Sequence, residues 1–171
     1  MIGFALSVML AQAPAVDQIP INAPFVTSPG EVVGAMLQLA AVKNTDVVYD
    51  LGCGDGRIVI HAAKKYGARG VGVDINPQRI AEARANAKEA GVEHLVRFEI
   101  KDIFDTDVRE ATVVALYLLP ELNLRLRPKL QKELKPGARI VSHQFHMGDW
   151  KADKEQVLGE SRIFLWTIPG G

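Results

Sequence analysis

The sequence predicts an α/β fold built on a doubly wound parallel sheet, and three features carry this prediction. Short apolar runs of strand length alternate with stretches of helical periodicity from residue 47 to residue 142. Strands that are separated by helices and buried on both faces need right-handed crossovers, which give such a sheet. A glycine-rich turn follows the first apolar run, and acidic residues follow the next two. We therefore expect a binding site at the carboxyl ends of the strands.

The first predicted element is a helix that begins after Ser28. Ser28, Pro29 and Glu31 stand at the N-cap, the first and the third helical positions, which is the arrangement of a capping box. Apolar residues recur at helical spacing after them. The helix is expected to run from about Pro29 to Ala41.

Five strands and three more helices are predicted after this helix. The strands are expected at residues 47–50, 70–74, 96–100, 112–116 and 139–142, and the helices at about 56–66, 77–90 and 121–134. The last segment differs, because the apolar runs 156–158 and 161–167 flank a Gly-Glu turn. That pattern predicts a terminal antiparallel hairpin.

The composition is that of one globular domain. The 171 residues are 48% hydrophobic and 23% charged. Twenty Lys and Arg residues balance twenty Asp and Glu residues, so no general attraction to nucleic acid is expected. Cys53 is the single cysteine, which excludes an internal disulfide. We expect Cys53 to be a reduced, structural thiol.

The N-terminal 23 residues are expected to lie apart from the folded domain, which is assigned to residues 24–171. An apolar run at residues 2–10 is followed by Ala11-Gln12-Ala13, the form of a signal-peptide cleavage site. The run contains no Lys or Arg and is shorter than the ~20 residues that span a bilayer as a helix. A short signal peptide, a membrane anchor and a packed helix remain open.

The glycine-rich turn reads D-L-G-C-G-D-G, with Asp50 at the end of the first strand and Gly52, Gly54 and Gly56 after it. Glycines in this place let a ligand approach the backbone closely. The spacing differs from the G-x-G-x-x-G of dinucleotide folds, and the carboxylate of Asp55 would repel a pyrophosphate. The turn therefore favours a ligand without phosphates.

Acidic residues follow the second and third strands. Asp74 stands where Rossmann-type sites place an acceptor for the ribose hydroxyls, and Asp102 could accept from an adenine amino group. Ile75 and Ile103 beside them would supply apolar walls for the ring. Such an acid-rich set of acceptors suits a cationic nucleoside, and S-adenosylmethionine is the expected cofactor.

The segment from Val47 to Ile103 resembles the class I S-adenosylmethionine-dependent methyltransferases, a Rossmann-like fold. The resemblance implies a seven-stranded sheet of order 3-2-1-4-5-7-6. It also implies that Asp50, Gly52, Gly54 and Gly56 line the methionine end of the cofactor, Asp74 the ribose and Asp102 the adenine.

Two longer motifs narrow the resemblance. The stretches Y-L-L-P-E-L-N-L-R-L-R-P and S-H-x-F-x-M-G-D-W are similar to those of the small protein-lysine N-methyltransferases. That family includes the mitochondrial enzymes for the adenine nucleotide translocase and for the c ring of the ATP synthase, and prokaryotic relatives. The resemblance implies a protein substrate bearing the target lysine, with Thr27 and Ser28 folding over the cofactor and Tyr117 beside the transferable methyl.

The residues after the fourth and fifth strands are the candidates for the acceptor side. A lysine pocket needs oxygen or aromatic groups to hold the amine and a route for its proton. Tyr117, His143 and Asp149 are candidate catalytic residues, with His146 as an alternative base. The candidate substrate contacts are Pro120, Glu121, Phe145 and Trp150. His143 and His146 lack a clear set of partnering ligands, so no metal is expected.

Several alternatives stay open at this point. The acceptor could be a small molecule methylated on nitrogen or oxygen, and the chain could be a non-catalytic nucleoside-binding module. A dinucleotide-dependent oxidoreductase is disfavoured by the loop spacing and Asp55. The apolar N-terminus makes a membrane protein one candidate substrate. It also predicts a place on the cytoplasmic side, associated with the membrane through residues 1–13, or else export.

Overall fold

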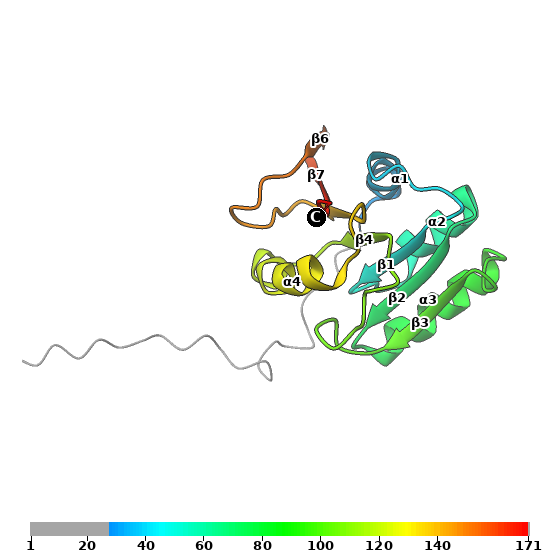
Figure 1. The fold of residues 1–171 in the computed structure, drawn as a ribbon. Coiled ribbons are helices and arrows are strands. Elements are labelled where there is room, and N and C mark those ends of the chain that lie inside the picture. The colour runs from blue at the N-terminus through cyan, green and yellow to red at the C-terminus, as the bar shows by residue number, and fades with distance from the viewer. Residues whose placement is uncertain (1–27, 171) are drawn as a thin grey trace, which may run out of the picture.

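A computed structural model of the protein describes residues 28–170, and the predicted α/β fold is confirmed (Figure 1). The helices are α1 (Gly30–Leu39), α2 (Arg57–Tyr66), α3 (Pro77–Glu89) and α4 (Pro120–Glu133). The strands are β1 (Val47–Leu51), β2 (Arg69–Asp74), β3 (Val96–Ile100), β4 (Val113–Leu116), β5 (Arg139–His143), β6 (Lys154–Leu158) and β7 (Ser161–Thr167). Each strand and helix predicted from the sequence is present, with ends that differ by one or two residues.

The seven strands form one sheet of order β3-β2-β1-β4-β5-β7-β6. The first five strands are parallel, and β7 pairs antiparallel with both β5 and β6. The order reverses beside β1, where β2 lies on one side and β4 on the other. Ligands of open α/β sheets bind at this point, so the loops after β1, β2 and β4 frame the expected site.

Helices cover both faces of the sheet (Figure 1). One core cluster joins the apolar faces of α1, α2 and α3 to side chains such as Val48, Val113 and Val141. The other joins Leu126 and Leu130 of α4 to the opposite face. β1 and β4 are buried along their whole length, as expected for central parallel strands. The loops at their carboxyl ends therefore stand on a rigid base.

The capping box predicted at Ser28 is wrong. The N-cap of α1 is Pro29, and no side chain caps this helix. The hydroxyl of Ser28 instead forms a 2.8 Å hydrogen bond with Nδ1 of His143, at the end of β5. A contact between residues 115 positions apart has replaced the local cap. Local pattern could not reveal it.

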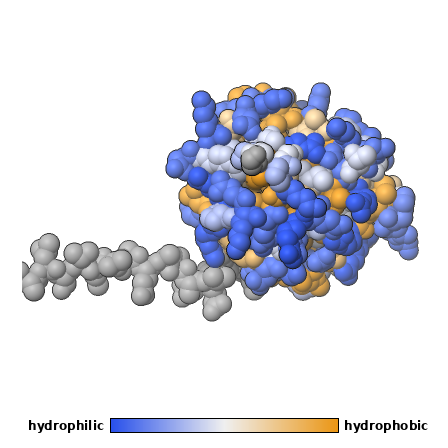
Figure 2. All heavy atoms as spheres, in the orientation of Figure 1, coloured by the Kyte–Doolittle hydropathy of each residue, from blue (hydrophilic) through white to orange (hydrophobic). Residues whose placement is uncertain are grey.

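The visible face of the folded part is mainly hydrophilic, with apolar side chains scattered among the charged ones (Figure 2). None of the helices within residues 28–170 is long and apolar enough to cross a membrane. The predicted domain boundary after residue 23, the apolar run and Thr27 lie outside the described residues.

Candidate active site

The glycine loop after β1 is fastened to the neighbouring strand. The backbone N–H groups of Gly52 and Cys53 both donate to the carbonyl of Val73, at 2.8 and 2.9 Å. The N–H of Gly56 turns back to the carbonyl of Cys53 at 2.9 Å. These bonds hold the loop against the carboxyl end of β2, where the sequence predicts the cofactor.

Gly56 closes the loop and begins α2 in a conformation that other residues rarely adopt. Its φ is +79°, and a Cβ placed on it would lie 2.7 Å from the ring of Phe98 and 2.9 Å from Ala83. Both the backbone conformation and the packing therefore require glycine. The third glycine of the motif thus sets the contact between α2, α3 and β3.

Asp74 supports the same loop from the end of β2. One carboxylate oxygen accepts from the N–H of Gly54 at 3.0 Å, and the other accepts from the N–H of Asn76 at 2.9 Å. Asn76 in turn caps α3 by accepting from the N–H of Gln78. Each carboxylate oxygen keeps capacity for a further hydrogen bond, which is what a pair of ribose hydroxyls requires.

Asp50 places a buried carboxyl group near the end of β1. It is 3% exposed, and no described residue donates a hydrogen bond to its side chain. Burial, together with the charges of Asp74 and Asp55, raises its pKa to about 8. A buried carboxyl group facing two like charges favours a cation beside it. The ammonium and sulfonium of S-adenosylmethionine fit this requirement.

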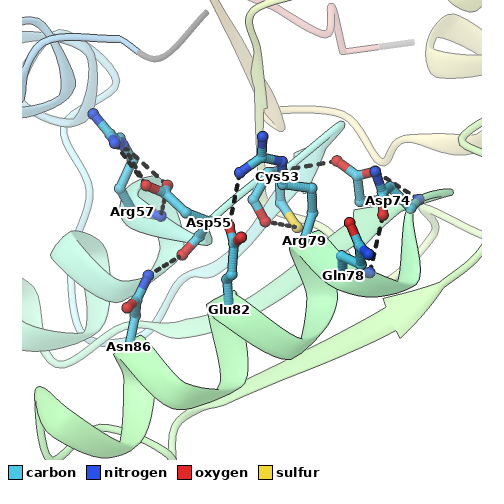
Figure 3. A network of polar contacts seen from close by, with 10 residues as sticks. Cys53, Asp55, Arg57, Asp74, Gln78, Arg79, Glu82 and Asn86 are labelled. Atoms are coloured by element: carbon cyan, nitrogen blue, oxygen red, sulfur yellow. Dashed lines mark hydrogen bonds and ion pairs between the residues drawn. The ribbon is translucent and has the colours of Figure 1, made fainter. Parts of the chain in front are cut away.

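An ion pair fixes the far end of the loop, beyond Cys53 (Figure 3). Asp55 accepts from Arg57 at 2.6 Å, and the same guanidinium donates to the carbonyl of Ser28 at 3.0 Å. Asn86 of α3 donates to the carbonyl of Asp55 at 3.0 Å. The carboxylate of Asp55 is therefore neutralised within the loop, and Ser28 is bound to the loop through Arg57.

The residues predicted around the adenine lie after β2 and β3. Ile75 is 60% exposed, unusual for a large apolar side chain beside a site, whereas Ile103 is half-buried. The carboxylate of Asp102 accepts from the N–H of Phe104 at 2.8 Å, which fixes it in its turn. A flat apolar ligand group between the isoleucines would cover Ile75.

Tyr117 and His143 meet at the carboxyl ends of β4 and β5. Their ring centroids lie 4.2 Å apart with the planes inclined by 35°. His143 is buried, and burial lowers its pKa. The hydroxyl of Tyr117 has no hydrogen-bond partner among the described residues, so it is free to meet a substrate. The structure thus brings together two of the three candidate catalytic residues.

The other acceptor-side candidates lie farther along the chain. Asp149 is an exposed residue paired with Arg127 of α4, and nothing in the described structure brings it against Tyr117. Pro120 and Glu121 begin α4, whereas Phe145 and Trp150 are half-buried in the turn after β5. His146 is exposed and accepts from the N–H of Gly148. Their roles remain predictions.

Sequence reasoning missed the polar residues that hold the acceptor side in place. Asn123 is fully buried, and its amide donates to the carbonyl of Phe145 at 3.3 Å. The hydroxyl of Ser142 donates to the same carbonyl at 2.7 Å. Asn123 shares a helical stripe with the buried Leu126 and Leu130. A polar residue on that stripe was the available signal, whereas Ser161 and Arg57 gave none.

Cys53 is buried inside the glycine loop. Burial and the charges of Asp50 and Asp74 raise its pKa well above the usual range of a thiol. It is therefore an inert thiol at physiological pH, as predicted. No group of three or more metal-ligating side chains comes together in the part of the chain that the structure describes.

Comparisons with known proteins bear directly on this site. A family model described as the ANTKMT methyltransferase domain matches residues 50–154. A protein-lysine N-methyltransferase of Saccharolobus islandicus is 49% identical over 153 residues, covering 86% of this chain and 94% of that protein. A lysine N-methyltransferase of Xenopus laevis, named for the c-type subunit of the ATP synthase, is 33% identical over 148 residues, covering 86% of this chain and 64% of that protein.

A solved structure matches over a similar length. It is described as an RNA methyltransferase from Salinibacter ruber in complex with S-adenosyl-L-homocysteine. It is 54% identical, with 85% of this chain and 95% of that chain covered and a TM-score of 0.84. The resemblance drawn from the glycine loop and the acceptor-side motifs is thereby confirmed. This chain belongs to the ANTKMT methyltransferase domain family and is an S-adenosylmethionine-dependent methyltransferase.

Proposed function

We propose that the protein methylates the side-chain amine of lysine in a membrane protein. The observation that carries methyl transfer is the placement of Asp50 and Asp74 on either side of the glycine loop, where they present acceptors to a cationic nucleoside. The lysine acceptor is supported by the relatives from S. islandicus and X. laevis, both named as lysine N-methyltransferases.

The described residues fit S-adenosylmethionine. Asp50 faces the cationic end, Asp74 the ribose and Asp102 the adenine, while Ile75 and Ile103 flank the ring. The cofactor supplies an electrophilic methyl group on a sulfonium. The protein must then bring a neutral amine in line with this methyl and exclude water.

The acceptor end is suited to an amine. The ring of Tyr117 lies at the end of β4, and its unpartnered hydroxyl can accept a hydrogen bond from the incoming lysine. Phe145 and Trp150 add aromatic faces after β5, which attract an ammonium group before it loses its proton. The ammonium must lose that proton before transfer, because its nitrogen has no lone pair otherwise.

The membrane component of the proposal rests on two observations. Residues 2–10 are an apolar run that could associate with a bilayer surface. The relative from X. laevis is named for a component of the ATP synthase. We place the site on the cytoplasmic side of the membrane, where S-adenosylmethionine is made. Export through a short signal peptide is the alternative.

The proposal is tested by incubating the protein with S-adenosylmethionine labelled with tritium in its methyl group. Salt-washed bacterial membranes and the matching soluble fraction serve as acceptors. The proposal predicts label in membrane protein, recovered as methyl-lysine after acid hydrolysis. Label confined to the soluble fraction would contradict the membrane component, and label absent from lysine would contradict lysine as the acceptor. Removal of the first 13 residues tests whether they aid transfer to membranes.

RNA is the second candidate acceptor, because the solved relative from S. ruber is described as an RNA methyltransferase. The balanced charge of this chain offers no broad basic surface for a phosphate backbone. The same assay separates the two classes. Label on protein is released by protease, whereas label on RNA is released by ribonuclease.

A further inference from the structure

His143 joins three segments that are far apart in the sequence. Its Nδ1 lies 2.8 Å from the hydroxyl oxygen of Ser28, ahead of α1. Its Nε2 lies 3.1 Å from the hydroxyl oxygen of Ser161, at the start of β7. The ring of Tyr117 packs on the same imidazole. Both nitrogens and one ring face of His143 are therefore occupied.

This arrangement is unlike that of a general base. A base needs a free nitrogen within hydrogen-bond reach of the proton that it removes. In neutral imidazole one nitrogen donates and the other accepts, and the two serine hydroxyls complete both bonds. Burial is the cause that disfavours the charged form, and no described charged group opposes it. His143 is therefore held neutral, with its nitrogens already engaged.

The turn after His143 is strained and firmly held. Gln144 has a φ of +70°, which side-chain-bearing residues rarely adopt. Its N–H donates to the carbonyl of Arg162 at 2.7 Å, next to Ser161 on β7. Ser142 and Asn123 both donate to the carbonyl of Phe145 on the other side of the turn. Strain that is held by so many bonds is typical of functional sites.

Ser28 connects this turn to the glycine loop. Its hydroxyl bonds to His143, while its carbonyl accepts from Arg57, which is paired with Asp55. The imidazole thus lies between the loop that faces the cofactor and the tyrosine that faces the acceptor. A change at His143 reaches both ends of the reaction without contact with either reactant.

We propose that His143 is a positioning residue, which binds Ser28 and Ser161 and fixes the ring of Tyr117 at the acceptor end of the site. This inference rests on the proposed methyl transfer, although its first test requires no acceptor. It assigns to Ser28 and Ser161 a part in the same arrangement.

Two substitutions separate the two ends of the arrangement. His143→Phe keeps an aromatic ring against Tyr117 but loses both bonds to serine. His143→Asn keeps an amide close to the position of Nδ1, and with it a bond to Ser28, but removes the ring. The exposed His94, at the opposite edge of the sheet, provides the matched control His94→Phe. Ser161→Ala and Ser28→Ala remove single bonds, and they serve if the histidine variants fail to fold.

Calorimetric titration with S-adenosylhomocysteine is the first readout. His143→Phe and Ser28→Ala should weaken binding by about tenfold, the worth of a lost hydrogen bond, because Ser28 is no longer fastened. His143→Asn should restore affinity to near that of the unaltered protein, and His94→Phe should not change it. Unchanged affinity in both His143→Phe and Ser28→Ala would overturn the inference, whether or not lysine is the acceptor.

The second readout is the rate of transfer to washed membranes from pH 7 to pH 9.5. A positioning role predicts that His143→Asn lowers the rate by the same factor at every pH, because Tyr117 has lost its neighbour. A general base predicts a loss that shrinks as the pH rises and lysine deprotonates in solution. Recovery of the rate at high pH would therefore show that His143 is a base. Absence of transfer by the unaltered protein would count against the proposed function and leave the binding test intact.

Discussion

The carboxylate of Asp74 accepts a hydrogen bond from the backbone N–H of Gly54 at 3.0 Å. The acid that ends β2 therefore shapes the glycine loop that follows β1. The same side chain fixes the start of α3 through Asn76. One carboxylate thus places two of the loops that frame the cofactor site, in addition to any bond that it makes to a ribose.

Asp74→Ala should remove these bonds together with the acceptors for the cofactor. We expect affinity for S-adenosylhomocysteine to fall by at least about 100-fold, the effect of losing two charge-assisted hydrogen bonds. Calorimetric titration measures it. Asp105→Ala, at an exposed position after β3, is the control and should bind normally. Full affinity in Asp74→Ala would remove Asp74 from the site.

Asp50 should make the stability of the ligand-free protein depend on pH. The raised pKa of about 8 keeps Asp50 protonated in the folded state, whereas an unfolded Asp ionises near pH 4. The folded protein then holds one extra proton between about pH 4 and pH 8, so its free energy of unfolding falls as the pH rises through this window. Above about pH 8 this contribution is constant.

Asp50→Asn replaces the carboxyl group with one that does not ionise, so it should lack this slope. Urea denaturation at pH 5.5, 7 and 8.5 measures the difference between the two proteins. We expect Asp50→Asn to gain stability relative to the unaltered protein as the pH rises. Parallel curves for the two proteins would mean that Asp50 is ionised throughout. Asp105→Asn controls for the loss of a carboxyl group elsewhere.

Gly56→Ala tests the packing beneath the loop. A Cβ there meets Phe98 and Ala83 below 3.0 Å and also strains a backbone of φ +79°. We expect unfolding in urea to show a loss of about 3 kcal/mol. Gly159→Ala is the matched control, because its φ is +60° but open space surrounds it. Strain alone should cost about 1 kcal/mol there. Equal losses would show that the contact with Phe98 is unimportant.

Tyr117→Phe removes a hydroxyl that has no partner among the described residues and keeps the ring on His143. Stability and affinity for S-adenosylhomocysteine should therefore stay unchanged. We expect kcat to fall by about tenfold, the worth of one hydrogen bond to the acceptor amine. The tritium assay on washed membranes measures this. A normal rate would exclude a catalytic role for the hydroxyl.

Much of this fold could be predicted because its signals are local. The central strands are buried on both faces, so they read as short apolar runs, and the helices begin and end at Pro, Gly and Asn. The loop glycines and Asp74 could be predicted for the same reason. They are consecutive or follow directly after strands, and the parallel sheet brings such positions to one edge.

The parts that could not be predicted depend on contacts between distant segments. Ser28 carries the pattern of a helix cap, but its hydroxyl bonds to His143. His143 has the chemistry of a base, yet its nitrogens are taken by two serines that no spacing connects to it. Asp149 is close to the acceptor motif in sequence, but it pairs with Arg127 at the surface. Tertiary structure decides the role of such polar residues.

The account depends above all on a glycine loop that binds a cationic nucleoside without phosphates. Calorimetric titration with S-adenosylhomocysteine, with NAD in a parallel titration, tests it most directly. We predict saturable binding of S-adenosylhomocysteine at one site per chain and no heat from NAD. Binding of NAD, or no binding of S-adenosylhomocysteine, would contradict the assignment of the loop and of the methyl transfer built on it.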